Sequence, residues 1–138
     1  MREILFRAKR LDNGEWVEGL PWKKKYKTDK WFISCFPNKD DDERHFVVDL
    51  KTVCQFTGMT DIHDEKIFEG DVVRFNRTNA LGWNTQRVGK VLYYDELPIF
   101  YILATTGDGW DWVDCRNIEV IGNIFDNPEL LKGGSGDE

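Results

Sequence analysis

The 138-residue sequence has few cysteines, no long apolar run and no signal-like amino terminus, and each shortage excludes a class of protein. Its three cysteines, Cys35, Cys54 and Cys115, cannot all pair and none stands in a C-x-x-C, so we expect a reduced, cytoplasmic setting. The longest apolar run, Leu97 to Ala104, is interrupted by Pro98 and is far shorter than the roughly 20 residues of a membrane-spanning helix. The first residues lack the apolar stretch of a signal peptide, so no membrane association is expected.

Positive charge is also scarce over the chain as a whole. The sequence holds 19 basic and 25 acidic residues, a net charge of −6, which disfavours a protein that binds nucleic acid through its whole surface. The charge is uneven, because the first 30 residues hold 9 basic and 5 acidic side chains. Hydrophobic residues make up 41% and aromatic residues 14% of the chain, which excludes wholesale disorder.

Short β-type segments separated by turn residues predict a mainly β fold, a β-meander with a small SH3-like barrel and one or two short helical turns. The Asp12-Asn13-Gly14 turn is typical of a hairpin between the first two strands. We expect a single β domain over residues 1–131, with amino-terminal strands in 1–50 and the SH3-like barrel portion in 66–126, and a flexible tail over 132–138. Strands are predicted over residues 4–8, 15–18, 30–36, 44–50, 71–76, 88–94, 99–105, 110–113 and 118–125.

Two short segments have helical signals, and two glycines have predicted backbone roles. Asp49 can cap a helical segment from Leu50 to Gln55, and a second segment runs from Pro128 to Lys132, where proline suits the first helical position. Gly70 is expected to permit a bend at the entry to a strand, and Gly89 to allow close approach of a neighbouring backbone.

Side chains with catalytic or metal-binding potential do not form a recognisable pattern. His63 lies in Asp61-Ile62-His63-Asp64-Glu65, but the spacing fits no zinc or calcium site and indicates a polar turn. His45 follows an acidic run and is expected at an exposed loop edge, and Cys54 lies in an apolar stretch that favours a buried, inert thiol. The sequence has no P-loop, G-x-S-x-G or H-E-x-x-H motif, so we expect no catalytic residues, no metal and no cofactor.

One segment has the composition of a binding surface. Between Trp22 and Trp31, five lysines and one aspartate are interleaved with aromatic residues, as a nucleic-acid surface requires. A hairpin loop whose lysines prevent edge pairing has the same composition. A second pair of tryptophans falls on one face of a predicted strand, where it can stack on a ligand or fill the core. The candidate binding residues are Trp22, Lys23, Lys24, Lys25, Tyr26, Lys27, Lys30, Trp31, Trp110 and Trp112.

Three blocks of the sequence resemble the YopX-like family of phage and prophage proteins. They are Phe6-Arg7-Ala8 with the turn that follows it, a central block made of residues 53–59 and 67–73, and the segment 120–131 that contains Gly122-Asn123-Ile124-Phe125. The chain departs from the family pattern at Cys54, where glycine is common, and at His63-Asp64, where an Asn-Gly turn is common. The family has no established catalytic residues, so the resemblance implies an accessory protein of phage or prophage without assigning a site.

Three functions remain in order of preference. The first is a non-catalytic protein-binding module that recognises a host or phage protein. The second is a small β-barrel that binds nucleic acid through the Trp22–Trp31 segment, and the net negative charge of the chain disfavours this function. The third, an enzyme, ranks last. The sequence leaves open whether the chain forms a homo-oligomer.

Overall fold

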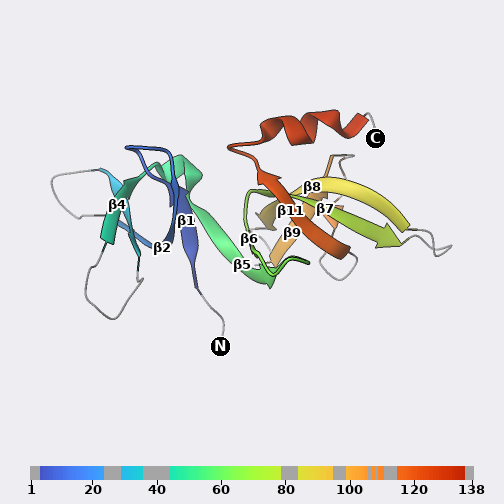
Figure 1. The fold of residues 1–138 in the computed structure, drawn as a ribbon, viewed down its shortest axis with the longest axis horizontal. Coiled ribbons are helices and arrows are strands. Elements are labelled where there is room, and N and C mark those ends of the chain that lie inside the picture. The colour runs from blue at the N-terminus through green and yellow to red at the C-terminus, as the bar shows by residue number, and fades with distance from the viewer. Residues whose placement is uncertain are drawn as a thin grey trace. The chain divides into compact units, whose positions relative to one another are not determined.

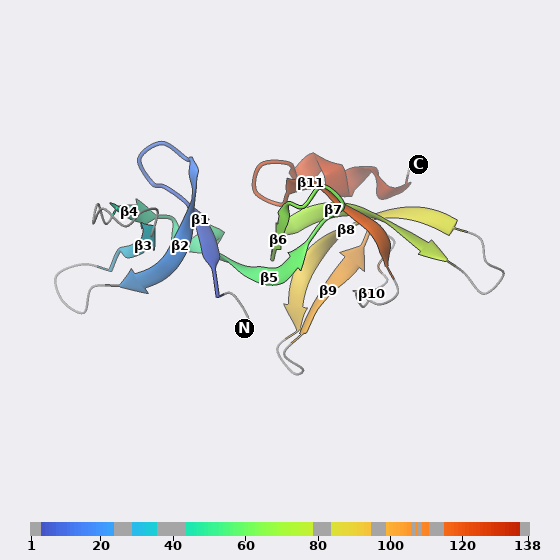
Figure 2. The same cartoon turned by 60° about the horizontal axis from the view of Figure 1, so that its bottom comes forward.

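The structure is a computed structural model in which the chain divides into two compact units, residues 1–58 and 59–138 (Figures 1 and 2). It describes residues 4–23, 29–35, 44–78, 84–94, 99–105, 107, 109–110 and 115–135. No helix in this described part has both the length and the apolar content needed to cross a membrane.

Antiparallel strands make up most of both units, so the prediction of a mainly β fold is confirmed. The first unit contains β1 (Phe6–Lys9), β2 (Trp16–Lys23), β3 (Trp31–Cys35), β4 (Arg44–Val48), the 3₁₀ turn η1 (Leu50–Thr52) and the start of β5 (Cys54–Thr60). The second contains β6 (Lys66–Phe68), β7 (Asp71–Thr78), β8 (Asn84–Tyr94), β9 (Ile99–Ala104), β10 (Gly109–Trp110), β11 (Arg116–Asn123) and the 3₁₀ helix η3 (Pro128–Ser135). The SH3-like barrel and the single domain over 1–131 stay predictions.

The first four strands form a closed circuit. β1 pairs with β2, β2 with β3, and β3 with β4, all antiparallel. Just past β1, Arg10 forms an antiparallel β-bridge with Val48 of β4, so the fourth strand is hydrogen-bonded to the end of the first. Two backbone hydrogen bonds of 3.0 and 2.9 Å flank this bridge, and they join Leu11 to Val47 and Asp49 to Lys9. The circuit therefore has an inner face and an outer face.

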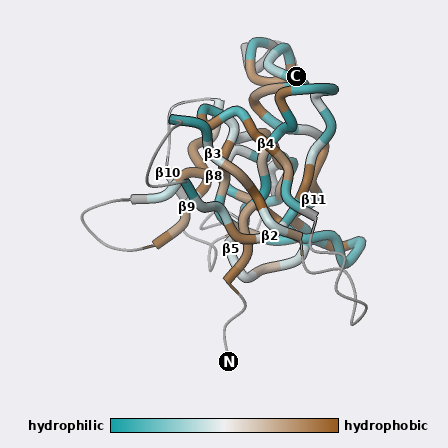
Figure 3. Tube along the Cα trace, turned by 90° about the vertical axis from the view of Figure 1, so that its left-hand side faces the viewer, coloured by the Kyte–Doolittle hydropathy of each residue, from teal (hydrophilic) through white to brown (hydrophobic). Residues whose placement is uncertain are grey.

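Strand alternation fills the inner face with apolar side chains. Ala8, Ile33 and Val48 are almost completely buried there and form the core of the unit. Five partly buried side chains pack around them: Val17, Trp31, Cys35, Phe46 and Val53. Figure 3 colours the chain by hydropathy as seen from the side of this unit, and both hydrophobic and hydrophilic segments are visible. The residues between these positions consequently point outward.

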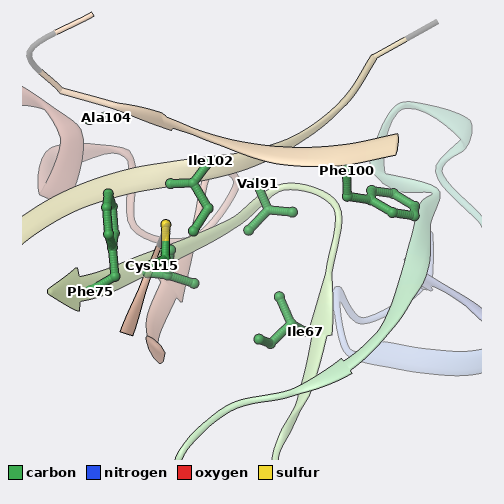
Figure 4. Packing of buried hydrophobic residues seen from close by; sticks show 8 residues of the cluster. Ile67, Phe75, Val91, Phe100, Ile102, Ala104 and Cys115 are labelled. Atoms are coloured by element: carbon green, nitrogen blue, oxygen red, sulfur yellow. The ribbon is translucent and has the colours of Figure 1, made fainter. Parts of the chain in front are cut away.

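The core of the second unit lies against a sheet with the strand order β10-β9-β8-β7-β11. Val73 and Phe75, predicted to share one face of their strand, are both fully buried in it. Figure 4 shows side chains from several strands pointing into this common interior. The buried cluster consists of Ile67, Val73, Phe75, Val91, Phe100, Ile102, Ala104 and Cys115.

The helical segment predicted from Leu50 to Gln55 is wrong in its second half. Asp49 caps it as expected, since its carboxylate accepts a hydrogen bond from the Lys51 amide at 3.0 Å. The segment nevertheless ends after one turn, because Cys54 begins β5, which pairs with β1. Local capping favours a helix here, but the backbone of β1 supplies a strand partner that local sequence does not reveal.

The carboxyl-terminal segment is helical as predicted, and two strands were not predicted. The helix η3 begins at Pro128 and continues to Ser135, into the segment expected to form a flexible tail.

β5 and β6 lie in the stretch between the two predicted groups of strands. β6 has only three residues, which is too short for a period-two pattern to be visible.

The two glycines with predicted roles occupy the conformations expected of them. Gly70 has φ +87°, donates to the Val91 carbonyl at 2.8 Å and accepts from the Ile124 amide at 2.9 Å. At Gly89 an added Cβ would lie 2.7 Å from the Leu103 carbonyl oxygen, so the strands approach too closely for a side chain. Gly70 therefore joins three segments of the second unit through a left-handed conformation that favours glycine.

A buried carboxylate organises the polar turn that contains His63. The side chain of Asp61, only 8% exposed, accepts hydrogen bonds from the amides of His63 (2.8 Å), Glu65 (3.0 Å) and Val120 (2.9 Å). Burial raises the pKa of this carboxyl, but the three amides favour its charged form more strongly, so the pKa lies below its ordinary value. Asp61 thus holds the turn against β11.

Replacing this carboxylate should weaken the fold in a pH-dependent way. We expect Asp61→Asn to lower the free energy of unfolding by about 1–3 kcal/mol at neutral pH, because an amide group cannot accept all three hydrogen bonds equally. The lowered pKa stabilises the fold above the unfolded-state value of about 4, and this stabilisation is lost as pH falls through the folded-state value. The difference between variant and wild type in urea titrations should therefore shrink in acid. Asp64→Asn, in the same turn but exposed, is the control, and an equal loss in both variants would contradict this role.

A side chain at Gly70 should be poorly tolerated. Gly70→Val places a β-branched residue at positive φ within a buried turn, so we expect a loss of about 1–3 kcal/mol in urea-induced unfolding. Gly109→Ala is the control, because its added Cβ meets Tyr101 only at an ordinary 3.6 Å. A Gly70→Val protein as stable as the control would show that the bend does not depend on glycine.

Candidate functional site

The structure describes four of the candidate binding residues in the predicted basic segment, and Trp22 and Trp31 among them lie on opposite faces of their strands. Trp22 lies on the outer face of the first unit, whereas Trp31 packs against the inner core. Lys23 is the cross-strand partner of Trp31. Lys30 is exposed beside β3. Lys24, Lys25, Tyr26 and Lys27 lie outside the described residues, as does Trp112, and the backbone of Trp110 belongs to β10.

A cluster of aromatic and polar side chains occupies the outer face of β2, β3 and β4. The ring of Trp22 stacks on that of Phe32, its cross-strand neighbour, with centroids 4.6 Å apart and planes inclined by 16°. His45 meets Trp22 edge to face, with centroids 5.6 Å apart and an angle of 87°. Ser34 lies opposite His45 in the strand register and beneath these rings, and it is only 8% exposed. We call Trp22, Phe32, Ser34 and His45 the outer cluster.

A hydrogen-bond chain fixes the orientation of the two ring systems. The indole Nε1 of Trp22 donates to the hydroxyl oxygen of Ser34 at 2.6 Å. That oxygen lies 2.6 Å from Nδ1 of His45. Because an indole nitrogen can only donate, the arrangement that uses every group has Ser34 donating to Nδ1 of a neutral His45 with its proton on Nε2. The cluster is therefore a rigid platform.

The hydroxyl and imidazole of the outer cluster have the elements of a nucleophile and a base. The oxygen of Ser34, however, accepts a hydrogen bond from Trp22 and is nearly buried. A nucleophilic hydroxyl needs an accessible oxygen. The arrangement is better suited to holding the aromatic rings in place than to attacking a substrate.

Cationic side chains lie on the same outer face, further along the circuit. The guanidinium of Arg7 lies 4.6 Å from the centroid of the Trp16 ring, and the ammonium of Lys9 lies 5.5 Å from it. Both cations come from β1, and the register places them opposite Glu18 and Trp16 of β2. Residues 1–58 hold 12 basic and 10 acidic side chains, whereas residues 59–138 hold 7 and 15. The outer face therefore belongs to the more positive of the two units.

An open pocket of about 520 Å³ lies at the closure of the first unit. Arg10 lies on one side of it, and its guanidinium forms a forked pair with Asp12 and stacks 4.3 Å from the centroid of the Phe46 ring. The hydrogen bond to Arg10 lowers the pKa of the Asp12 carboxyl, and the same bond raises the pKa of Arg10. The pocket is lined by Arg10, Leu11, Asp12, Lys30, His45, Phe46 and Val47.

The other candidate positions have structural partners. Nε2 of His63 lies 3.1 Å from Oε2 of Glu119. The other carboxylate oxygen of Glu119 lies 3.5 Å from Nη1 of Arg74. The thiol of Cys54 is buried and donates to the Thr52 carbonyl, and the three cysteines of the described chain form no disulfide. The described residues contain no group of three or more metal-binding side chains.

Sequence reasoning missed three of the four members of the outer cluster. His45 is exposed as expected, but it belongs to β4 rather than to a loop. Phe32 and Ser34 alternate with inward-pointing residues along β3, so period-two alternation places them together on one face. Their meeting with His45 depends on the register between β3 and β4, which the local sequence does not specify.

Comparisons with known proteins establish the family. The family model described as YopX protein matches residues 5–132, so this chain belongs to the YopX family. The family resemblance read from the sequence blocks is thereby confirmed. No curated protein sequence matches the chain.

A solved structure shares the fold. The crystal structure of protein EF1440 from Enterococcus faecalis is similar over 95% of this chain and 99% of that chain, with a TM-score of 0.56 and 21% sequence identity. At this identity the likeness concerns the fold alone.

Removing the central hydroxyl should loosen the outer cluster. We expect Ser34→Ala to shift the indole proton resonance of Trp22 and to lower stability by about 0.5–1.5 kcal/mol, because Trp22 and His45 lose a shared partner. Long-range proton–nitrogen spectra should show the proton of neutral His45 on Nε2 in the wild type. Ser34→Thr, which keeps the hydroxyl, should restore the indole resonance; equal effects of the two substitutions would contradict the hydrogen-bond chain.

Proposed function

We propose that this YopX protein is an accessory protein of phage or prophage that works as a non-catalytic protein-binding module. Its binding surface is the outer face of β2, β3 and β4. The observation that carries this proposal is the stacked pair of Trp22 and Phe32 on the side of the strands that faces away from the core of the unit.

The physical argument rests on preorganisation. Aromatic side chains contribute large contact areas at a small cost in conformational entropy, and they are enriched among residues that dominate protein interfaces. Trp22 is already fixed by Phe32 and Ser34, so binding would order few further side chains. Leu20, on the same face and 41% exposed, extends the apolar surface beside this platform.

A substitution on this face should abolish partner capture without affecting the fold. We expect Leu20→Lys to remove a partner that tagged wild-type protein retains from host lysate after nuclease treatment, because a charge would be buried in the interface. Leu50→Lys is the matched control, since Leu50 is 54% exposed and lies on η1. Capture that survives Leu20→Lys, or is lost equally in the control, would contradict the proposed surface.

The same cations and rings also favour a second candidate function, binding of single-stranded nucleic acid. Arg7 and Lys9 beside Trp16, together with the Trp22–Phe32 pair, provide charges and stacking surfaces. The net charge of −6 opposes this function, so we rank it second.

Salt dependence distinguishes the two functions. Each lysine–phosphate contact contributes about 0.7–0.9 to the log–log slope of affinity against salt. If nucleic acid also contacts the lysines that follow Trp22, as the sequence predicts, changing Lys23, Lys24 and Lys25 together to glutamine should reduce the slope by roughly two to three. We expect instead no measurable binding of a labelled oligothymidylate at physiological salt. Tight binding that is lost in the triple variant would reverse the ranking.

A further inference from the structure

We propose that the pocket beside the outer cluster binds a carboxylate side chain of an acidic, partly apolar peptide, with Arg10 as the group that recognises it. This inference rests on the proposed function and names the chemistry of the partner segment. It is carried by the fixed guanidinium of Arg10 at the edge of an open pocket of about 520 Å³.

Arg10 is held in position before any ligand arrives. Its Nε donates to one oxygen of Asp12 at 2.9 Å and its Nη2 donates to the other oxygen. The ring of Phe46 supports the plane of the guanidinium from a distance of 4.3 Å. Its remaining terminal nitrogen, Nη1, has no partner among the residues that the structure describes, so it can donate to a ligand at little cost in conformational entropy.

The lining of the pocket selects for a side chain with both charge and apolar surface. Leu11, Phe46 and Val47 supply apolar surface, while Arg10, Lys30 and His45 supply polar nitrogen atoms. A glutamate or aspartate next to apolar residues presents the complementary surface. The excess of basic side chains in residues 1–58 makes this unit the one that an acidic segment would approach.

Asp12 determines which anion fits. Its carboxylate occupies the Nε–Nη2 edge of the Arg10 guanidinium, so a ligand meets the Nη1–Nη2 edge beside an existing negative charge. A phosphate carries close to two negative charges at neutral pH, so it would be repelled by Asp12 more strongly than a carboxylate. A single negative charge on a peptide side chain therefore fits this pocket best.

The pocket and the outer cluster share one residue, His45 of β4. The neighbouring residue Phe46, which supports Arg10, packs toward the core of the unit. The pocket is therefore tested separately from the Trp22–Phe32 platform.

The test measures binding of a short fluorescein-labelled peptide of glutamate, leucine and serine by fluorescence polarisation. The same peptide with glutamine in place of glutamate is expected to bind at least about tenfold more weakly, because its contacts are not charge-assisted. A phosphoserine version and a labelled oligothymidylate should also bind more weakly. Equal binding of the glutamine peptide, or tighter binding of either phosphate-containing probe, would overturn the assignment of a carboxylate.

Two variants with opposite effects isolate Arg10. Arg10→Gln should weaken binding about fivefold or more, and Lys51→Gln, with the same change of charge on η1, should not. Asp12→Asn should tighten binding about threefold, because it removes the negative charge beside the ligand while the amide oxygen of asparagine can still accept from Nε of Arg10. Glu15→Gln makes the same change of charge in the same hairpin and should have a smaller effect. An unchanged affinity in Arg10→Gln, or weaker binding in Asp12→Asn, would refute the proposal.

The two proposals fail in distinguishable ways. If the acidic peptide does not bind but Leu20→Lys still abolishes partner capture, the module remains and the carboxylate assignment is wrong. If the peptide binds and its binding depends on Arg10, but Leu20→Lys does not affect capture of the lysate partner, the carboxylate pocket is confirmed and the proposed outer binding surface is wrong. Melting curves of each variant by circular dichroism establish that binding is compared between folded proteins.

Discussion

The bridge between Arg10 and Val48 is the constraint on which the functional reading depends. It joins the end of β1 to β4, so the strands of the first unit have partners all the way round. Without it, β4 would be an open edge and both faces of its sheet could meet solvent equally. With it, Ala8, Ile33 and Val48 become an enclosed core, and the alternate residues must point outward.

The outward residues are more aromatic than a solvent-facing strand surface requires. Trp16, Trp22 and Phe32 occupy outer positions, and each has a polar or aromatic partner that fixes its ring. The closure also places Arg10 and Leu11 beside β4, which creates the pocket next to the outer cluster. The same closure therefore forms the pocket and leaves the Trp22–Phe32 pair on the side away from the core.

Features determined by neighbouring residues could be predicted from the sequence, whereas features determined by distant pairing could not. Asn13-Gly14 predicted the first hairpin because positive φ at Gly14 is a local requirement. The alternation of Val73 and Phe75 likewise predicted their burial. In contrast, β5 was not predicted because it is stabilised by β1, and the outer cluster was not predicted because Ser34 and His45 meet only through the β3–β4 register.

Hydrogen exchange at the closure tests the account most directly. The amides of Leu11 and Asp49 donate to Val47 and Lys9 on either side of the bridge. If the circuit is closed, both amides should exchange as slowly as the central Ile33 amide, whose strand has partners on both sides. Exchange of Leu11 and Asp49 as fast as that of the turn residue Asn13 would mean that the strands do not close, and the division into inner and outer faces would be lost.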